Sequence, residues 1–500
     1  NILSKERLAS LGKIASLAMS QMGPEREVIV CRAPGRVNLM GRHIDHQGGY
    51  VNEMAVSREV LLVAAPRNDD LFTLTNIDSD RHPSREFRIT EILDETSWGD
   101  WIDFIESVTV RQVLENGPED WSHYARAPLL RLQHERPDLP LKGMDCIVGG
   151  NIPMGAGLSS SSALVVGFAE AAIALNGLNV AVRDFVDLCG EGEWFVGSRG
   201  GSADHAAIRT GLAGHVTRIG FFPFSIEDSI PMPPGIEILI IDSKEKAVKS
   251  RGAPAREIYN QRVATYKIAF QLLQQAWPPA RGAMHFRDLV PDRLGVGISD
   301  LYQALARLPT RASRREIGRL VDIKGSQELD RVFESHRNIG PYDLRGVALY
   351  GLGECVRADQ FAECLKSDNL QAVRQLMQTS HDGDRLYSYR ADGTPRRYSV
   401  RTDDATLSQL ANSNSDLSLQ PGRYGCSTQK IDRIVDIVSA TKGVVGAQLS
   451  GAGLGGCAMA IVHSGTKEVV VGQLEKAFSN HGSEIPALYD CKPVAGAGLI

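Results

Sequence analysis

Hydrophobic and polar residues alternate along the chain with two different periods. Apolar residues recur at helical spacing over residues 3–20, and the same period predicts a long amphipathic helix over residues 255–276. Short apolar runs bounded by turn residues predict strands, which cover residues 27–31, 60–65, 72–75, 145–150 and 236–242. Helices and strands are therefore both expected along the chain.

The polar segments between these elements suggest how the chain is divided. A Pro- and Gly-rich stretch at residues 231–235 predicts a domain boundary, with an N-terminal domain over 1–215 and a C-terminal domain over 235–500. Within the second domain, residues 280–335 are rich in Arg and resemble a solvent-exposed insertion. Residues 384–425 are dense in small and polar residues, which predicts a long loop or a lid beside a site.

Composition and charge narrow the class of protein. The chain has 500 residues, of which 43% are hydrophobic and 23% charged, as is usual for globular proteins of about two to four domains. The net charge of −5 is too small to indicate nucleic acid or a membrane surface as a partner. The eight cysteines lie far apart without a CxxC pair, and the first residues lack the apolar core of a signal peptide. We therefore expect a cytoplasmic protein.

The first chemically dense segment covers residues 32–49 (RAPGRVNLMGRHIDHQGG). It places Arg, His, Asp and Gly between two apolar strands, and we expect it to be a loop. Buried polar groups must each find a partner, so this density is costly for packing and indicates a site. The alternative from composition is a polar surface hairpin.

The second segment is residues 153–162 (PMGAGLSSSS), between the strand at 145–150 and a small-residue helix over 163–175. Glycines let the backbone approach an anion, and the amides of a helix N-terminus point at it. Serine hydroxyls can bind Mg²⁺ or its waters. No Lys follows the last Gly, so this is not the GxxxxGK[ST] pattern. A flexible turn or a helix cap is the alternative.

The third segment is residues 449–460 (LSGAGLGGCAMA), a glycine cluster that continues into an apolar strand. By itself such a cluster is also compatible with a tight turn between strands. Three segments of this kind in one chain together favour a binding site.

In this order the three motifs resemble those of the GHMP kinase superfamily, which includes galactokinase and the mevalonate and homoserine kinases. Residues 41–49 (GRHIDHQGG) are most similar to the galacturonokinase branch, whose signature reads GAHIDHQGG. Similarity to that branch continues at residues 121–126 (WSHYAR), 259–263 (YNQRV) and 446–453 (GAQLSGAG). The resemblance covers most of the chain and implies a two-domain α+β fold with the active site in the interdomain cleft.

The resemblance further implies an ATP- and magnesium-dependent kinase that phosphorylates the anomeric hydroxyl of a sugar. Asp204, in the sequence GGSADH, takes the place of the catalytic aspartate of the family, and Arg36 takes that of its partner arginine. A carboxylate can accept the proton of the sugar hydroxyl, while a guanidinium keeps that carboxylate ionised and offsets charge on the transferred phosphoryl group. A structural helix cap is the alternative role of Asp204.

By the same resemblance the sugar-binding positions fall on Arg42, His43, Asp45 and Tyr259, and Gly453 would approach the sugar or the phosphates. The residues expected to hold the triphosphate of ATP are Gly155, Gly157, Leu158, Ser159, Ser160 and Ser161.

The expected magnesium ligands are Ser161 and an acidic residue. The family has a Glu five residues before the glycine that matches Gly197, and this chain has Gly192 there, between Glu191 and Glu193. Either neighbour could serve after a shift of one residue, and we favour Glu193.

Arg42 departs from the galactokinase pattern, which has a Glu that accepts hydrogen bonds from sugar hydroxyls. A guanidinium cannot accept a hydrogen bond, but it pairs well with a carboxylate or a phosphate. Galacturonokinase itself has Ala there, so this argument rests on Arg42 alone. It predicts an acidic sugar such as galacturonate, or a sugar phosphorylated at its far end. The alternative is that Arg42 turns outward or pairs with a protein carboxylate.

Our expectation from the sequence is thus a sugar 1-kinase for an acidic monosaccharide. The alternatives are a galactokinase proper, a kinase of a heptose or octose phosphate, and a galactokinase-like sensor without turnover. The presence of both Arg36 and Asp204 argues against a silent sensor. The expected partners are the sugar and ATP, with neither nucleic acid nor membrane, in a monomer or homodimer.

Overall fold

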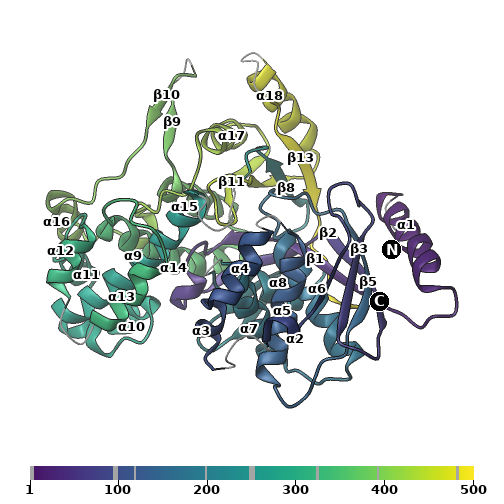
Figure 1. Cartoon of the computed structure of the whole chain (residues 1–500). Coiled ribbons are helices and arrows are strands. Elements are labelled where there is room, and N and C mark those ends of the chain that lie inside the picture. The colour runs from purple at the N-terminus through teal and green to yellow at the C-terminus, as the bar shows by residue number, and fades with distance from the viewer. Residues whose placement is uncertain are drawn as a thin grey trace.

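The structure is a computed structural model that describes residues 5–93, 99–117, 120–197, 200–246, 254–321, 326–390, 393–479 and 484–500. Two β-sheets carry helices packed on them, and a mainly helical region lies beside both (Figure 1). This combination confirms the expected α+β class. Among the helices of the described residues, none is long and apolar enough to cross a membrane.

The first sheet has the order β14-β1-β2-β5-β3-β4, and β6 pairs with the start of β2 and with β7. Its strands are β1 (Ile29–Met40), β2 (Val51–Pro66), β3 (Leu71–Asn76), β4 (Arg85–Arg88), β5 (Met144–Gly150), β6 (His215–Gly220), β7 (Ser225–Pro231) and β14 (Gly498–Leu499). The first sheet therefore extends beyond residue 215, where the sequence predicted the first domain to end, and the C-terminus returns to it.

The polar motif at 32–49 is not the expected loop in its first half. Residues 32–40 continue β1, which pairs antiparallel with β2 so that Asn38 lies opposite Glu53. Val37 and Leu39 are fully buried in the core, while Arg36 and Asn38 share the other face. Strand alternation thus lets one segment supply both core and polar site residues. The turn after it contains the short helix η1 (Asp45–Gln47).

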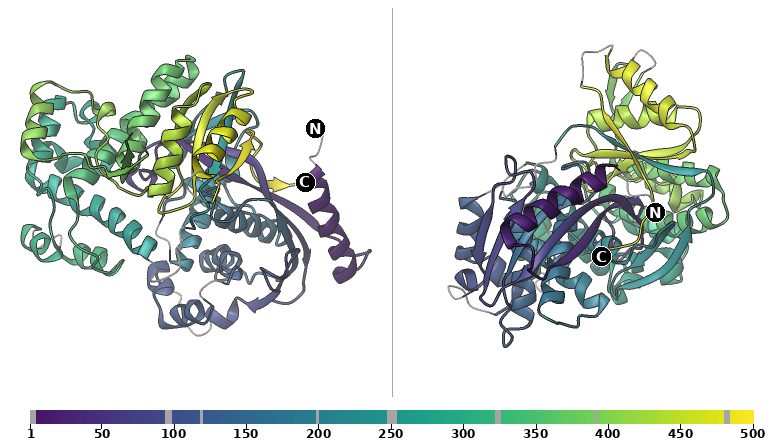
Figure 2. Two further views of the ribbon diagram at one scale, coloured as in Figure 1. Left: turned by 90° about the horizontal axis from the view of Figure 1, so that it is seen from above. Right: turned by 90° about the vertical axis from the view of Figure 1, so that its right-hand side faces the viewer.

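Helices cover both faces of this sheet (Figure 2). Ile14 of the N-terminal helix packs on Leu61, Val63 and Ile147, while the alternate positions of the same strands belong to the main core on the opposite face. The helices of this part are α1 (Lys5–Met22), α2 (Thr90–Leu93), α3 (Trp101–Ile105), α4 (Val108–Asn116), α5 (Ser122–Glu135), α6 (Ser160–Leu175), α7 (Val182–Glu193), η2 (Trp194–Val196) and α8 (Ala203–Thr210).

The second sheet has the order β11-β12-β8-β13 and packs against two helices through an aliphatic core. Its strands are β8 (Ile236–Asp242), β11 (Val444–Ser450), β12 (Cys457–His463) and β13 (Ala487–Cys491), and its helices are α17 (Gln429–Ser439) and α18 (Lys467–Ser479). The strand predicted at 236–242 is confirmed as β8.

The helical region has a core of its own, although the second half of α14 and the buried residues of α15 pack into the main core with strands of both sheets. It includes α9 (Pro254–Ala276), η3 (Pro278–Gly282), η4 (Phe286–Leu289), α10 (Pro291–Leu294), α11 (Ile298–Ala306), α12 (Arg314–Leu320), α13 (Ser326–Glu334), α14 (Leu344–Lys366), α15 (Leu370–Asp384), α16 (Asp404–Asn412) and η6 (Leu417–Leu419). The Arg-rich segment at 280–335 is therefore partly core, because Phe286 and Leu301 are buried in it.

Residues 384–425 are not one long loop, as their composition predicted. They contain the hairpin of β9 (Tyr387–Tyr389) and β10 (Pro395–Arg397), which projects from the molecule in Figure 1, and the helices α16 and η6. Leu407 and Ala411 of α16 are buried in the helical core. A few well-spaced apolar residues thus anchor a segment whose overall composition is polar.

Candidate active site

An ion pair between a buried arginine and a partly exposed aspartate connects β1 with the start of α8. Nε and Nη2 of Arg36 donate to Oδ1 of Asp204 over 2.8 and 2.5 Å. Nη1 of the same guanidinium donates to the carbonyl of Gly157 over 2.9 Å, and the Arg36 amide donates to the carbonyl of Leu158 over 3.1 Å. One arginine therefore contacts both the predicted base and the predicted phosphate loop, residues 153–159.

The environment of Asp204 keeps it ionised. Burial would raise its pKa, but the charge of Arg36 and the hydrogen bonds from Ser159 and Arg36 outweigh burial and lower the pKa below its ordinary value. The side chain is still 32% exposed, so a ligand could reach it. Its two oxygens accept from Arg36 and Ser159, which argues against a role as a helix cap. A hydroxyl placed beside Asp204 could donate to it.

The phosphate loop joins β5 to α6 through three residues with positive φ, which are Gly155 (74°), Gly157 (68°) and Ser159 (55°). Glycine adopts this conformation at little cost, whereas Ser159 is strained there. The Ser159 hydroxyl donates to Oδ2 of Asp204 over 2.5 Å. Helix α6 begins at Ser160, and the first amides of a helix lack intrahelical partners. The loop therefore has the arrangement that binds phosphate groups.

The third motif packs on this loop. A Cβ on Gly456 would lie 3.2 Å from the carbonyl oxygen of Gly155, and one on Gly451 would lie 3.3 Å from that of Gly157. Gly453 has φ of 76° and sits against the carbonyl of Cys426, from which a Cβ would be 2.1 Å away. The motif thus supports the phosphate loop and keeps its own turn tight, and a contact of Gly453 with a substrate stays a prediction.

Glu191 and Glu193 lie in different environments. Oε2 of Glu193 lies 2.8 Å from Nε2 of His205 and accepts from the Ser162 hydroxyl over 2.8 Å. Burial would raise the pKa of Glu193, but His205 and Ser162 lower it overall. Glu191 instead pairs with Arg131 of α5, over 2.6 and 2.9 Å. Glu193 is therefore the carboxylate that lies beside the start of α6.

A magnesium ion fits this donor set by its chemistry. Mg²⁺ prefers oxygen ligands, with one or two carboxylates and the phosphates of the nucleotide. The Glu193 carboxylate and the hydroxyls of α6 are such oxygens, and Ser162 rather than the predicted Ser161 contacts Glu193 directly. The roles of Ser161 and Glu193 toward a metal stay predictions.

Asp45 and Tyr259 converge on the turn that precedes Asp204. A Cβ on Gly201 would lie 2.0 Å from Oδ2 of Asp45, and one on Gly200 would lie 3.8 Å from the Tyr259 hydroxyl. Burial and the nearby carboxylates of Asp45 and Asp204 raise the pKa of Tyr259 well above its ordinary value. The glycines allow these side chains to come close to the turn, which brings two polar groups near the turn that leads into Asp204.

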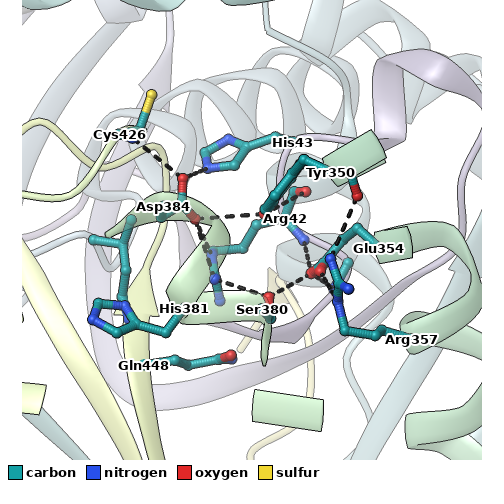
Figure 3. A network of polar contacts seen from close by, with 12 residues as sticks. Arg42, His43, Tyr350, Glu354, Arg357, Ser380, His381, Asp384, Cys426 and Gln448 are labelled. Atoms are coloured by element: carbon teal, nitrogen blue, oxygen red, sulfur yellow. Dashed lines mark hydrogen bonds and ion pairs between the residues drawn. The ribbon is translucent and has the colours of Figure 1, made fainter. Parts of the chain in front are cut away.

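Arg42 does not present a free guanidinium. Its Nε and Nη2 donate to Oδ2 of Asp384 over 3.3 and 3.2 Å, and Nη2 also donates to the hydroxyl of Ser380 over 2.9 Å. The ring of His43 stacks on that of Tyr424, with centroids 4.2 Å apart. Its Nε2 lies 3.5 Å from Oδ1 of Asp384 (Figure 3). The structure therefore matches the alternative in which Arg42 pairs with a protein carboxylate.

A second ion pair extends this cluster into α14. Oε1 of Glu354 accepts from the amides of Gly41 and Arg42 and from Ser380, and Oε2 accepts from Nε of Arg357 over 2.7 Å (Figure 3). The side chains of Glu354, Arg357 and Asp384 have no exposed surface. The cluster thus fixes the turn that carries Arg42 and His43 against α14 and α15.

Sequence reasoning missed two features of this site. Asp384 accepts the hydrogen bonds of Arg42 but lies 342 positions later in the chain, so no local sequence pattern predicts this contact. Lys246 lies beside the phosphate loop, with Cγ 3.7 Å from the position of a Cβ on Gly155. Lys246 follows the end of β8 by four residues, and no spacing in the sequence links it to the phosphate loop.

Comparison with known proteins gives three family matches along the chain. The models are described as the galactokinase galactose-binding signature, matching residues 20–66, the GHMP kinases N terminal domain, matching residues 123–211, and GHMP kinases C terminal, matching residues 396–480. The first contains Arg36, Arg42 and Asp45, and the second contains the phosphate loop and Asp204.

Curated relatives and a solved structure match nearly the whole chain. The galactokinase of Roseiflexus sp. (strain RS-1) is 25% identical over 473 residues, which are 94% of this chain and 93% of that protein. The galactokinase of Chloroflexus aurantiacus is 26% identical over 94% of this chain and 92% of its own length. The fold is shared with Lactococcus lactis galactokinase complexed with galactose, at a TM-score of 0.67 and 20% identity, over 97% of this chain and 99% of that one.

These matches agree with the geometry of the phosphate loop and the Arg36–Asp204 pair. The N- and C-terminal kinase models match two separate segments of the chain, and the two relatives named above are both galactokinases. The chain has the GHMP kinase fold, is similar to galactokinases over nearly its whole length, and is an ATP-dependent sugar kinase.

Proposed function

We propose that this kinase phosphorylates the anomeric hydroxyl of a neutral sugar, galactose, with ATP as the phosphoryl donor. The observation that carries the choice of sugar is the buried pair of Arg42 and Asp384. A guanidinium already neutralised by a carboxylate offers little to a uronate or to a sugar phosphate. Relatives named galactokinase and the match to a galactose-binding signature support the same sugar. Galacturonate, our expectation from sequence, is thereby replaced by its alternative.

The reaction follows from the position of Asp204. The anomeric hydroxyl donates its proton to the carboxylate as the oxygen attacks the γ-phosphorus of ATP, and the bond to the bridging oxygen of ADP breaks. Arg36 stabilises the ionised carboxylate and balances negative charge near the transferred group. Because Asp204 has a lowered pKa, it acts mainly by orienting the hydroxyl and takes the proton late.

The nucleotide would be held by the phosphate loop and the start of α6. The amides of residues 155–161 supply hydrogen-bond donors, and Lys246 supplies a positive charge beside Gly155. A magnesium ion, held by Glu193 and the serines of α6, would neutralise charge on the phosphates. The phosphate loop and the start of α6 would thus position the triphosphate for transfer.

A panel of sugars tests this proposal. ADP release is measured with ATP and Mg²⁺ and with galactose, galacturonate, glucose, arabinose or a heptose 7-phosphate. We expect the highest kcat/KM with galactose. A preference for galacturonate or for the sugar phosphate would contradict our account of Arg42 while keeping the kinase assignment. No turnover of any sugar, with ATP still bound, would favour the sensor.

A further inference from the structure

A second buried carboxylate stands behind the catalytic ion pair. Glu53 lies in β2 directly opposite Asn38 of β1, and its side chain is 1% exposed. Oε1 accepts from Nδ2 of Asn38 over 2.8 Å and lies 3.6 Å from Nε of Arg36. The same Nε donates to Asp204 over 2.8 Å, so one N–H of Arg36 faces two carboxylates.

The second oxygen of Glu53 has an unusual environment. Oε2 is buried and has no hydrogen-bond partner among the described residues. Thr217 lies opposite Glu53 in the register of β6, and its buried hydroxyl likewise lacks a partner in the described part of the chain. A buried anionic oxygen without a donor is costly, whereas a protonated oxygen carries no charge.

The charges around Glu53 also favour its protonated form. Arg36 faces it from β1, Asp204 from α8 and Asp45 from η1, and the residue opposite on β6 is uncharged. Two carboxylates and one guanidinium leave an excess negative charge if both acids are ionised. Burial, together with Asp204 and Asp45, outweighs the charge of Arg36 and the hydrogen bond from Asn38 and raises the pKa of Glu53 to about 8, while the pKa of Asp204 is lowered. Glu53 is thus the neutral acid and Asp204 the ionised one, the division seen where enzymes use two carboxyl groups for different roles.

We propose that Glu53 is a positioning residue of the phosphoryl transfer. As a neutral acid on the neighbouring strand, it contacts Arg36 and fixes its position. Because it carries no charge, the guanidinium charge of Arg36 acts on Asp204 and on the reacting phosphoryl group. The proposal rests on the proposed role of Arg36 and Asp204. When Glu53 ionises, it competes for Arg36 and adds negative charge behind the site, which disfavours the approach of ATP phosphates. Turnover should therefore fall as the pH rises through the titration of Glu53.

The test compares the pH dependence of kcat in the wild type, Glu53→Gln and Glu53→Ala. The wild type should lose activity through an alkaline limb centred near pH 8, and Glu53→Gln should keep activity at pH 7 and lack that limb. Glu53→Ala should lower kcat by on the order of tenfold to a hundredfold, because Arg36 loses its support. Glu59→Gln is the matched control, since Glu59 is a buried acid of the same strand that pairs with Arg32. Its alkaline limb should match that of the wild type.

Thermal unfolding gives a readout that needs no turnover. A carboxyl whose pKa is raised on folding destabilises the folded state increasingly as the pH rises from about 4.5 to about 8. The melting temperature of Glu53→Gln should therefore gain on that of the wild type over this range and then level off. An unchanged alkaline limb in Glu53→Gln, or normal kcat in Glu53→Ala, would overturn the proposal. Absence of turnover in the wild type with the expected thermal result would instead refute the proposed function.

Discussion

The buried pair of Arg42 and Asp384 carries our choice of substrate, and replacing Asp384 by Asn tests it in the absence of any sugar. The carboxylate of Asp384 is fully buried and accepts hydrogen bonds from Arg42 and from the amide of Cys426. Asn keeps the size of the side chain and can still accept from Cys426. The change therefore removes the charge and leaves the Arg42 guanidinium buried without its counter-ion.

The loss in free energy of unfolding that Asp384→Asn should cause can be derived in two ways. Burial would raise the pKa of Asp384, but His43 and Arg42 lower it from 3.8 to about 2, which corresponds to about 2.5 kcal/mol. Breaking one side of a buried ion pair costs about 3–5 kcal/mol. We expect Asp384→Asn to lower the free energy of unfolding by about 2.5–5 kcal/mol. For a cooperative unit of 150–250 residues, this lowers the melting temperature by roughly 5–20 °C.

Thermal unfolding at several pH values checks this result. The pKa of Asp384 is lowered on folding, so its stabilisation is present above about pH 4 and is lost as the pH falls toward 2. The difference in melting temperature between the wild type and Asp384→Asn should shrink over that range. Asp404→Asn is the control, because Asp404 pairs with Arg345 at the surface, with 82% of its side chain exposed, and should cost about 1 kcal/mol or less.

A double variant separates the ion pair from other effects of the substitution. In Arg42→Met with Asp384→Asn, no charge of the pair remains buried, so stability should recover at least in part. If Asp384→Asn lowers stability no more than the surface control does, Arg42 and Asp384 do not form a stabilising buried pair. A double variant as unstable as the sum of the two single ones would lead to the same conclusion, because it would mean that Arg42 does not depend on Asp384.

Three further predictions concern the site. Asp204→Asn should abolish turnover while ATP still binds, as steady-state rates and calorimetry would show, and near-normal kcat would remove Asp204 from the mechanism. Gly201→Ala places a methyl group 2.0 Å from Oδ2 of Asp45, so the KM for the sugar should rise about tenfold or more with little change for ATP. Glu193→Gln should raise the Mg²⁺ concentration needed for half-maximal rate, whereas the matched variant Glu191→Gln should not, and equal effects would contradict the assignment.

The motifs could be predicted because each depends on local chemistry. A strand, a Gly- and Ser-rich turn and a helix of small residues specify the phosphate loop within about 30 residues, and β5 and α6 confirm both flanking elements. The amphipathic helix expected at 255–276 is confirmed as α9, one residue longer. The proximity of Arg36 and Asp204 came from the resemblance, since 168 positions separate them.

The parts that sequence reasoning missed depend on long-range contacts. No sequence pattern near Arg42 indicates that α15 brings Asp384 to it, so the sequence alone favours a guanidinium that is available to an anionic substrate. The polar density of residues 32–40 predicts a loop, but in β1 the polar residues Arg36 and Asn38 alternate with the apolar core residues Val37 and Leu39. In both cases the tertiary structure, and not the local sequence, determines which partner a polar side chain contacts.

Identifying the product formed from galactose tests whether this kinase phosphorylates the anomeric hydroxyl of that sugar. Wild-type enzyme is incubated with ATP, Mg²⁺ and galactose, and the reaction is followed by ³¹P NMR together with the release of ADP. Our account predicts one new phosphate ester, coupled to the anomeric proton, in equal amount to ADP. A phosphate ester on another oxygen of the sugar, or no ester from galactose while galacturonate is phosphorylated, would contradict it.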